Sequence, residues 1–339
     1  MNKIKYFFSR ITKMDYKEAF KTINRINKKT HISKFYLFFD MVYSGFKHGA
    51  GYVDYEYYKM YDLNKEERLT IMTRGRSNHY VAELNPKEYW HYFDNKNEFN
   101  EKFEKYLGRD WMFIDGNNLD EFKNFIKKHS VIMVKPNDLS CGKGIKKIHT
   151  TKGMKLDKLY EECIQNNTLL IEEVATQNDT ISSLHPHSVN TIRMVTIIAD
   201  NGKPYVATAV IRIGANKKVV DNFNAGGVCA MIDLKTGRIC SPAVNSEGII
   251  YNLHPTTKVK LENFQIPMWK EIQSLVLKAA MVVPEIRLVG WDICLSKNGP
   301  ILIEGNQFPA HDLYQPLFGI NGSREGAVPL FEKIIHNKK

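Results

Sequence analysis

Alternating apolar and polar positions between Ile286 and Pro309 predict two short strands joined by a tight turn. The turn falls at residues 297–299, because Asn-Gly between two alternating apolar runs is a strong hairpin signal. If the turn spans these three residues, Asp292 lies directly opposite Glu304. Side chains alternate between the two faces of a strand, so one face is apolar and the other polar. The apolar face would carry Val289, Trp291, Ile293, Leu295, Ile301 and Ile303, and the polar face would carry Asp292, Glu304 and Asn306.

Apolar residues recur at helical intervals in several other stretches of the chain. In residues 16–26 and 35–46, within a region rich in Lys, Tyr and Phe, this spacing predicts packed helices. A further helix is predicted from Asp94 to Leu107, with an Asn or Asp cap and a charged outer face. The N-terminal part of the chain is therefore expected to be mainly helical.

A strand that reads as buried, residues 131–134, leads through Lys135 into a small polar loop and a second strand at residues 145–148. Glycine lets such a loop approach a phosphate closely with its backbone N–H groups. Neither the P-loop pattern nor the dinucleotide-binding glycine pattern occurs. The segment therefore predicts a phosphate-covering loop of another type. Its candidate residues are Ser140, Gly142 and Gly144.

A second hairpin is predicted around a turn at residues 200–202, and each of its strands carries an arginine among apolar residues. Arg193 and Arg212 need an anionic partner, since a buried unpaired charge is costly. A phosphate or an acyl phosphate would serve, and so would a structural carboxylate. The loop that follows contains Asn222 and Asn224, whose polar groups suit a phosphate or an acceptor substrate.

Composition limits the class of protein without choosing a substrate. With 339 residues and 43% hydrophobic content, the chain can form a large core in two or three subdomains. The net charge of +11 allows nucleic acid, an anionic membrane surface or anionic small molecules as partners. Dispersed lysines and the lack of nucleic-acid-binding motifs argue against nucleic acid. The five cysteines are scattered, which predicts free thiols in a reducing compartment.

The first eleven residues are basic but lack the apolar core and cleavage site of a signal peptide. No run approaches the roughly 20 apolar residues of a membrane-spanning helix. These features predict a cytoplasmic protein. Phe7, Phe8 and Ile11 fall near one helical face framed by basic residues, so peripheral contact with an anionic membrane is the alternative to an ordinary solvated helix.

Two carboxylates and an amide on one face of the 286–309 hairpin suit a hard cation. Mg²⁺ prefers oxygen ligands and fills its remaining positions with water and substrate phosphates, and Mn²⁺ accepts similar ligands. The alternative is a surface hairpin whose acids point into water. Trp291 and the Ile-rich run make both strands read as central, and acids in a buried sheet need a cation or a base beside them. We therefore favour a metal site at Asp292, Glu304 and Asn306.

The pattern of Asp292, about a dozen residues and then E-x-N-x-x-P resembles the metal-binding signature of the ATP-grasp superfamily. The motifs SVNTIRMVT, N-x-x-x-G-G and GWDICL…GPILIEGN, in that order, resemble the sugar-transfer-associated ATP-grasp proteins of polysaccharide biosynthesis, over about residues 35–320. The resemblance implies an α+β ATP-grasp fold, in which two α+β subdomains sandwich the nucleotide behind a mainly helical N-terminal region. The expected boundaries are 1–90 for the helical region, 91–175 and 176–325 for the subdomains, and 326–339 for a basic tail.

The same resemblance implies roles for individual residues. Lys96, at the start of the 94–107 helix, and Lys135 would reach the nucleotide phosphates, and the glycine loop would be a lid over them. One Glu and the backbone after it would meet the adenine edge, which places Glu172, Glu173 and Val174 at the hinge that holds adenine. Asp179 stands where the family often has an acid for ribose. Mg²⁺ on Asp292, Glu304 and Asn306 would bridge two phosphates of ATP.

The chemistry implied by the resemblance is attack of a carboxylate on the γ-phosphate, followed by capture of the acyl phosphate by an amine or a hydroxyl. The expected product joins a small carboxylic acid, an amino acid among the candidates, to a sugar of a cell-surface polysaccharide such as a capsule, or to its precursor. A kinase that phosphorylates a sugar hydroxyl is the rival within the fold. A basic polyanion-binding module without catalysis is the rival from another class.

The chain departs from the D-alanine-D-alanine ligase type at two places. Pro309-Ala310-His311 stands where that type has Pro-Gly after the asparagine, so acceptor specificity does not carry over. That type has an arginine two positions before the metal-binding aspartate, where this chain has Gly290. The group that stabilises the reacting centre must then come from elsewhere. The candidates are Arg193, Arg212 and Arg287.

Overall fold

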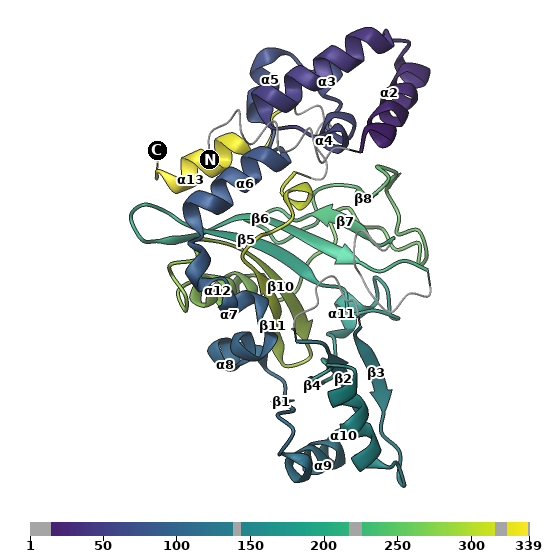
Figure 1. Ribbon diagram of the computed structural model, residues 1–339, viewed down its shortest axis with the longest axis vertical. Helices are drawn as coiled ribbons and strands as arrows, with labels where there is room; N and C mark the ends of the chain where they lie inside the picture. Colours follow the sequence, from purple (N-terminus) through teal and green to yellow (C-terminus); the bar gives the residue numbers. More distant parts are fainter. Residues whose placement is uncertain (1–14, 138–143, 217–225, 316–323, 338–339) are drawn as a thin grey trace. The chain divides into compact units, whose positions relative to one another are not determined.

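The computed structural model describes residues 15–137, 144–216, 226–315 and 324–337 (Figure 1). The chain divides into two compact units, one made of residues 1–84 with 310–339 and the other of residues 85–309. Within the described ranges, no helix is both long enough and apolar enough to cross a membrane.

The first unit is helical. Asp15 caps its first helix, because the side chain accepts a hydrogen bond from Glu18 N, and Leu37 and Met41 of the next helix pack into a small core with Ile23. This agrees with the helices expected from the apolar spacing. The elements of the unit are α2 (Tyr16–Thr30), α3 (Lys34–His48), α4 (Tyr52–Tyr57), η1 (Met60–Asp62), α5 (Lys65–Thr70), α6 (Arg74–Leu84), η4 (His311–Leu313) and α13 (Val328–Ile335).

The second unit contains two antiparallel sheets. The smaller has the strand order β1-β4-β2-β3, and the larger has the order β11-β10-β5-β6-β7-β8-β9. Its helices and 3₁₀ turns are η2 (Lys87–Tyr89), α7 (His91–Asp94), α8 (Lys96–Leu107), α9 (Leu119–Lys128), α10 (Leu156–Gln165), α11 (Asp179–Ser182) and α12 (Trp269–Ala280). Its strands are β1 (Trp111–Phe113), β2 (Val131–Lys135), β3 (Lys146–His149), β4 (Leu170–Glu173), β5 (Ile192–Ile198), β6 (Pro204–Ile213), β7 (Val228–Met231), β8 (Ala243–Asn245), β9 (Ile250–Tyr251), β10 (Leu288–Ser296) and β11 (Gly299–Asn306).

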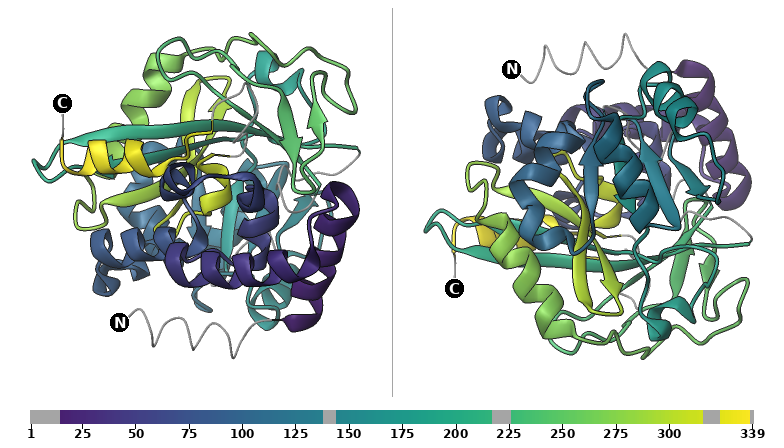
Figure 2. Two further views of the ribbon diagram at one scale, coloured as in Figure 1. Left: turned by 90° about the horizontal axis from the view of Figure 1, so that it is seen from above. Right: turned by 90° about the horizontal axis from the view of Figure 1, so that it is seen from below.

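Each sheet buries one face under helices. Helices α9 and α10 cover the small sheet through a core that contains Phe122, Tyr160 and Ile132 (Figure 2). Helix α12 packs on the large sheet through Ile272 and neighbouring apolar residues. Helix α8 begins at Lys96 behind the cap Asn95, as the cap signal predicted, and ends at a left-handed glycine.

The β10–β11 hairpin differs in detail from the sequence prediction. Ser296 pairs with Gly299, so the turn has two residues instead of three, and a β-bulge between Asp292 and Ile293 shifts the register by one. The two differences cancel, and Asp292 still faces Glu304. Beyond the bulge the faces are exchanged: Leu302, not Ile301 or Ile303, packs in the core with Val289, Trp291, Ile293 and Leu295. The placement of Ile301 and Ile303 on the apolar face was therefore wrong.

Candidate active site

The three expected metal ligands lie together on the paired strands β10 and β11. Asp292 is buried and stands opposite Glu304, whose side chain reaches solvent, and Gly290 stands opposite Asn306. The Asn306 amide lies 3.4 Å from both Glu304 Oε1 and the Gly290 carbonyl oxygen, to which it donates. Strand pairing thus brings together two carboxylates and one amide, all from a stretch in which the first and last residues are 14 positions apart.

Two arginines from neighbouring strands pair with Asp292. Arg193 on β5 lies directly opposite Asp292 and donates through both Nε and Nη2, the latter at 2.9 Å from Oδ2. Arg212 on β6 places Nη2 at 2.9 Å from the same oxygen, while its Nε donates to Thr191 Oγ1 at 2.9 Å. The sequence left a phosphate, an acyl phosphate or a structural carboxylate as partners of these arginines. In the structure the partner is the carboxylate of Asp292, which belongs to the expected metal site.

This charge arrangement sets the protonation of the two acids. Burial alone would raise the pKa of Asp292, but Arg193 and Arg212 outweigh it and hold that pKa well below its usual range. The Glu304 side chain reaches solvent. The surrounding protein and the neighbouring Asp292 carboxylate raise the pKa of Glu304. The pKa of Asp292 is therefore lowered and that of Glu304 is raised, although the two carboxylates lie in one site.

Gly290 makes room for Arg193. A Cβ atom at Gly290 would lie 2.8 Å from Pro309 Cβ and 3.3 Å from Arg193 Nη1. This glycine, at the position where the D-alanine-D-alanine ligase type has an arginine, thus leaves space for the side chain of Arg193 as it pairs with Asp292. An arginine is present at this point, but it comes from the adjacent strand.

Arg287 is not brought to this site, which corrects its place among the candidates. It stands before β10 and donates to the Ile198 carbonyl oxygen at 2.8 Å and to Asp200 at 2.7 Å, beside the β5–β6 turn. Arg193 lies at the other end of β5. Arg287 therefore fixes the turn and has no contact with Asp292.

A second charged cluster lies on the small sheet around Glu172. The Glu172 carboxylate is almost fully buried, pairs with Lys135, and accepts hydrogen bonds from Asn100 at 3.0 Å and from Arg109 at 2.9 and 3.2 Å. Burial would raise the pKa of Glu172, but Arg109 and Lys135 outweigh it and hold the pKa well below its usual range. Lys135 and Glu172 belong to the predicted nucleotide residues, and the structure pairs them.

Arg109 connects this cluster to strand β11, which carries Glu304 and Asn306. The sequence patterns did not single out this residue. Its Nη1 donates to the Leu302 carbonyl oxygen at 2.5 Å, and its Nη2 donates to the Ile303 carbonyl oxygen at 3.4 Å. These carbonyls lie at the β-bulge, where Ile303 has no direct partner in the β10–β11 ladder. The available signal was an arginine just before a short apolar strand, which did not indicate its distant partners. Asn100 was also missed, because it lies in an otherwise ordinary charged helix.

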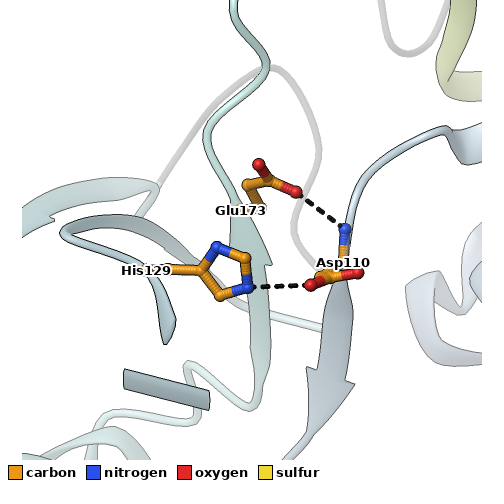
Figure 3. Close-up of side chains that lie close together, drawn as sticks. All are labelled: Asp110, His129 and Glu173. Atoms are coloured by element: carbon orange, nitrogen blue, oxygen red, sulfur yellow. Dashed lines mark hydrogen bonds and ion pairs between the residues drawn. The ribbon is translucent and has the colours of Figure 1, made fainter. Parts of the chain in front are cut away.

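Glu173 points to the opposite face of its strand from Glu172. Its carboxylate accepts a hydrogen bond from Asp110 N at 3.1 Å, and His129 Nε2 lies 2.9 Å from Asp110 Oδ2 (Figure 3). The donor atoms of these three residues lie within 4.8 Å of one another, but Lys128 already pairs with Asp110. Because neighbouring side chains alternate in direction, Glu172 and Glu173 cannot both turn toward the same ligand.

The other predicted nucleotide residues lie at the margins of these clusters. Lys96 Nζ is 3.3 Å from the Asn137 carbonyl oxygen, directly before the glycine loop. Gly144 has a φ of +74°, as a glycine-dependent loop requires. Val174 begins a segment that crosses to the large sheet, where Asn178 N donates to the Leu295 carbonyl oxygen at 2.8 Å. Asp179 is exposed and lies 3.4 Å from Lys297. Ser140, Gly142, Asn222 and Asn224 lie outside the described residues.

Two antiparallel sheets with helices on them and an acidic hairpin beside arginines agree with the ATP-grasp fold expected from the motifs. The comparison with protein families identifies the branch. The chain belongs to the sugar-transfer associated ATP-grasp family, whose model matches residues 75–317. The resemblance stated from the motifs is confirmed, and so is the α+β ATP-grasp fold with its helical N-terminal region. No curated protein sequence matches this chain.

The solved structures that this chain resembles share little sequence with it. D-alanyl-alanine synthetase A from Vibrio cholerae is 14% identical over 72% of this chain and 63% of its own, with a TM-score of 0.42. The biotin carboxylase domain of 2-oxoglutarate carboxylase from Hydrogenobacter thermophilus, solved with MgADP, ADP and bicarbonate, is 13% identical over 76% and 50%, with a TM-score of 0.46. Biotin carboxylase from Campylobacter jejuni is 12% identical over 72% and 46%, with a TM-score of 0.44. The chain thus spans less than two thirds of each of these proteins.

Proposed function

We propose that this protein is an ATP-dependent ligase that activates a small carboxylate, an amino acid among the candidates, and joins it to an amine or a hydroxyl of a cell-surface polysaccharide sugar or its precursor. The observation that carries the proposal is the group formed by Asp292 and Glu304 with Arg193 and Arg212 beside them. It combines an acidic site for a cation with cationic side chains for an anionic substrate. In this proposal the nucleotide lies between residues 91–175 and 176–325.

The donor set fits Mg²⁺. Asp292 and Glu304 are two carboxylates in one site, and burial by the surrounding protein together with the neighbouring Asp292 charge raises the pKa of Glu304. A divalent cation bound between them would offset this repulsion. Asp292, Glu304 and Asn306 would hold the ion. When bound, Mg²⁺ or Mn²⁺ would neutralise phosphate charge and orient the γ-phosphate for attack.

The side chains of the protein would position the reactants and exclude water. Lys96 and Lys135 would offset phosphate charge, with Glu172 and Arg109 holding Lys135 ready when no nucleotide is bound. Arg193 and Arg212 are the candidates for holding the carboxylate donor. A carboxylate oxygen attacks the γ-phosphorus and ADP leaves. The amine or hydroxyl then attacks the acyl carbon, inorganic phosphate leaves with the acyl oxygen, and the acceptor loses its proton. The glycine loop would shield this acyl phosphate from hydrolysis.

The proposal is tested by ADP release from MgATP with a panel of carboxylic acids and hydroxylamine, which traps an acyl phosphate as a hydroxamate. We expect one acid to give ADP together with its hydroxamate, identified by mass. Glu304→Gln should lower both signals by about 100-fold or more, because it removes a charged ligand of the ion. Glu271→Gln on α12 is the matched control, since it removes the same charge at an exposed position outside the site.

Two results would redirect the proposal. If MgATP binds and sugars or lipid-linked saccharides drive ADP release without any hydroxamate, the protein is a kinase on the same fold. If MgATP does not bind, both assignments fail.

Peripheral membrane contact through residues 1–14, which lie outside the described residues, remains a separate part of the proposal.

A further inference from the structure

Helix α3 turns one apolar face toward solvent. Phe35, Phe39, Val42 and Phe46 follow one another at helical intervals along it, and Phe35 is 75% exposed, Phe39 54% and Phe46 55%. The opposite face, with Leu37, packs in the core of the first unit. Large aromatic side chains seldom remain in water along three turns of a helix, because each leaves a large apolar area unburied. This face therefore requires an explanation that the active site does not supply.

The exposed rings form one connected surface that continues onto α2. The rings of Phe35 and Phe39 are 4.6 Å apart between centroids, those of Phe38 and Phe39 are 5.3 Å apart, and Phe20 of α2 stacks on Phe38 at 6.1 Å. Helices α2 and α3 are consecutive and contact each other (Figure 1). We call this surface the aromatic face. It consists of Phe20, Phe35, Phe38, Phe39, Val42 and Phe46.

The charge around the aromatic face is positive. The acids of α2 and α3 are engaged within the unit: Glu18 pairs with Lys21 at 2.6 Å, and Asp40 accepts from both Arg68 and Tyr55. Exposed lysines lie on the same two helices. They are Lys17, Lys28, Lys29, Lys34 and Lys47. In the described part of the chain, none of these lysines is paired with a carboxylate.

We propose that the aromatic face docks on the surface of an anionic phospholipid membrane. Phenylalanine rings enter the boundary between headgroups and acyl chains, and lysines around them are attracted to anionic lipid. A protein partner or a second copy would also cover an apolar face. The unpaired lysines, which have no neutralising acid on these two helices, favour a negatively charged surface. The inference does not depend on the proposed function, because it concerns other residues.

The test is co-sedimentation of the full chain with phosphatidylcholine vesicles, with or without phosphatidylglycerol, at low and high salt. We expect binding only to the anionic vesicles and a marked decrease at high salt. Phe35→Ser/Phe39→Ser should weaken binding by about tenfold or more, because each ring removed leaves less apolar area to bury. Lys28→Glu/Lys29→Glu should weaken it at low salt and make it less salt-dependent. Retained MgATP binding and helical circular dichroism would show that the variants fold.

A matched control separates this face from general stickiness. Ile250→Ser/Leu253→Ser removes two apolar residues of similar exposure in the second unit and should leave vesicle binding unchanged. The proposal is overturned if the full chain ignores anionic vesicles, or if Phe7→Ser/Phe8→Ser abolishes binding while Phe35→Ser/Phe39→Ser does not. It is also overturned if Phe35→Ser/Phe39→Ser converts a dimer to a monomer without any effect on vesicles, since the face would then be a contact between copies.

Discussion

Asp292 and Glu304 are both acids of the candidate site, but they differ in burial and in the charges beside them. Asp292 is buried and pairs with Arg193 and Arg212, whereas Glu304 reaches solvent and faces a like charge. Removing one partner of a buried ion cluster leaves the others without compensation. Substitutions of the two residues should therefore differ in their effect on the free energy of unfolding, although both residues would be needed for activity.

Asp292→Asn should lower the free energy of unfolding by about 3–5 kcal/mol, because it leaves two buried arginines without a carboxylate. Glu304→Gln should change it little or raise it slightly, since repulsion between the acids disappears. Urea unfolding followed by circular dichroism measures both. Equal destabilisation by the two variants would contradict this assignment of roles.

At the scale of the element, the β10–β11 hairpin depends on close packing at Gly290. The short distances from a Cβ at this position to Pro309 and Arg193 leave no space for a side chain. Arg193 lies against Gly290 while it pairs with Asp292, so the packing of the strand and the ion cluster are coupled. A change at Gly290 would therefore affect a charge that it does not itself carry.

Gly290→Ala should cost about 1–3 kcal/mol of stability through overpacking and should also reduce MgATP-dependent activity by displacing Arg193. Gly51→Ala is the control, because nothing lies within 4 Å of its Cβ position and its φ of −76° suits alanine. Thermal unfolding and ADP release test the two variants together. If Gly290→Ala were as mild as Gly51→Ala, the proposed coupling would be wrong.

At the scale of the whole molecule, acid stability should depend on His48 in the first unit. Burial, reinforced by Arg76 and Arg68, lowers the pKa of His48 to about 4 from an ordinary 6.5. The neutral ring fits its place, because Arg76 Nη2 lies 2.9 Å from His48 Nδ1 and donates to it. The unfolded chain binds the proton more readily than the folded chain, so stability falls as the pH falls from about 6.5 to about 4.

His48→Asn, which keeps an acceptor near the position of Nδ1, should flatten this part of the stability profile, by up to about 3 kcal/mol at pH 4. The acids Asp292 and Glu172 act in a lower window, since their pKa values are depressed below ordinary carboxyl values. Unfolding midpoints measured at several pH values separate the two effects. An unchanged slope between pH 6.5 and 4 in the variant would rule out His48 as the cause.

The sequence by itself determined the main elements and the fold class. Alternation placed the β10–β11 hairpin and the cap at Asn95 placed the start of α8, because these patterns depend on local backbone geometry. The predicted pairing of Asp292 with Glu304 is also found, but only because the shorter turn and the bulge cancel. The motif order was enough to identify the family. The roles of the candidate nucleotide residues remain predictions, since no ligand contact tests them.

Only the tertiary structure decided which charged groups meet. The pairing of Arg193 and Arg212 with Asp292 and the link from Glu172 through Arg109 to β11 join residues far apart in the chain. The bulge at Ile303 lies within one hairpin, but the alternation of side chains did not reveal it. A local pattern shows that a buried charge needs a partner but not which residue supplies it, because the partner is set by strand order and register. The exposed aromatic face was hidden for the same reason, since helical spacing does not reveal which apolar residues the core leaves uncovered.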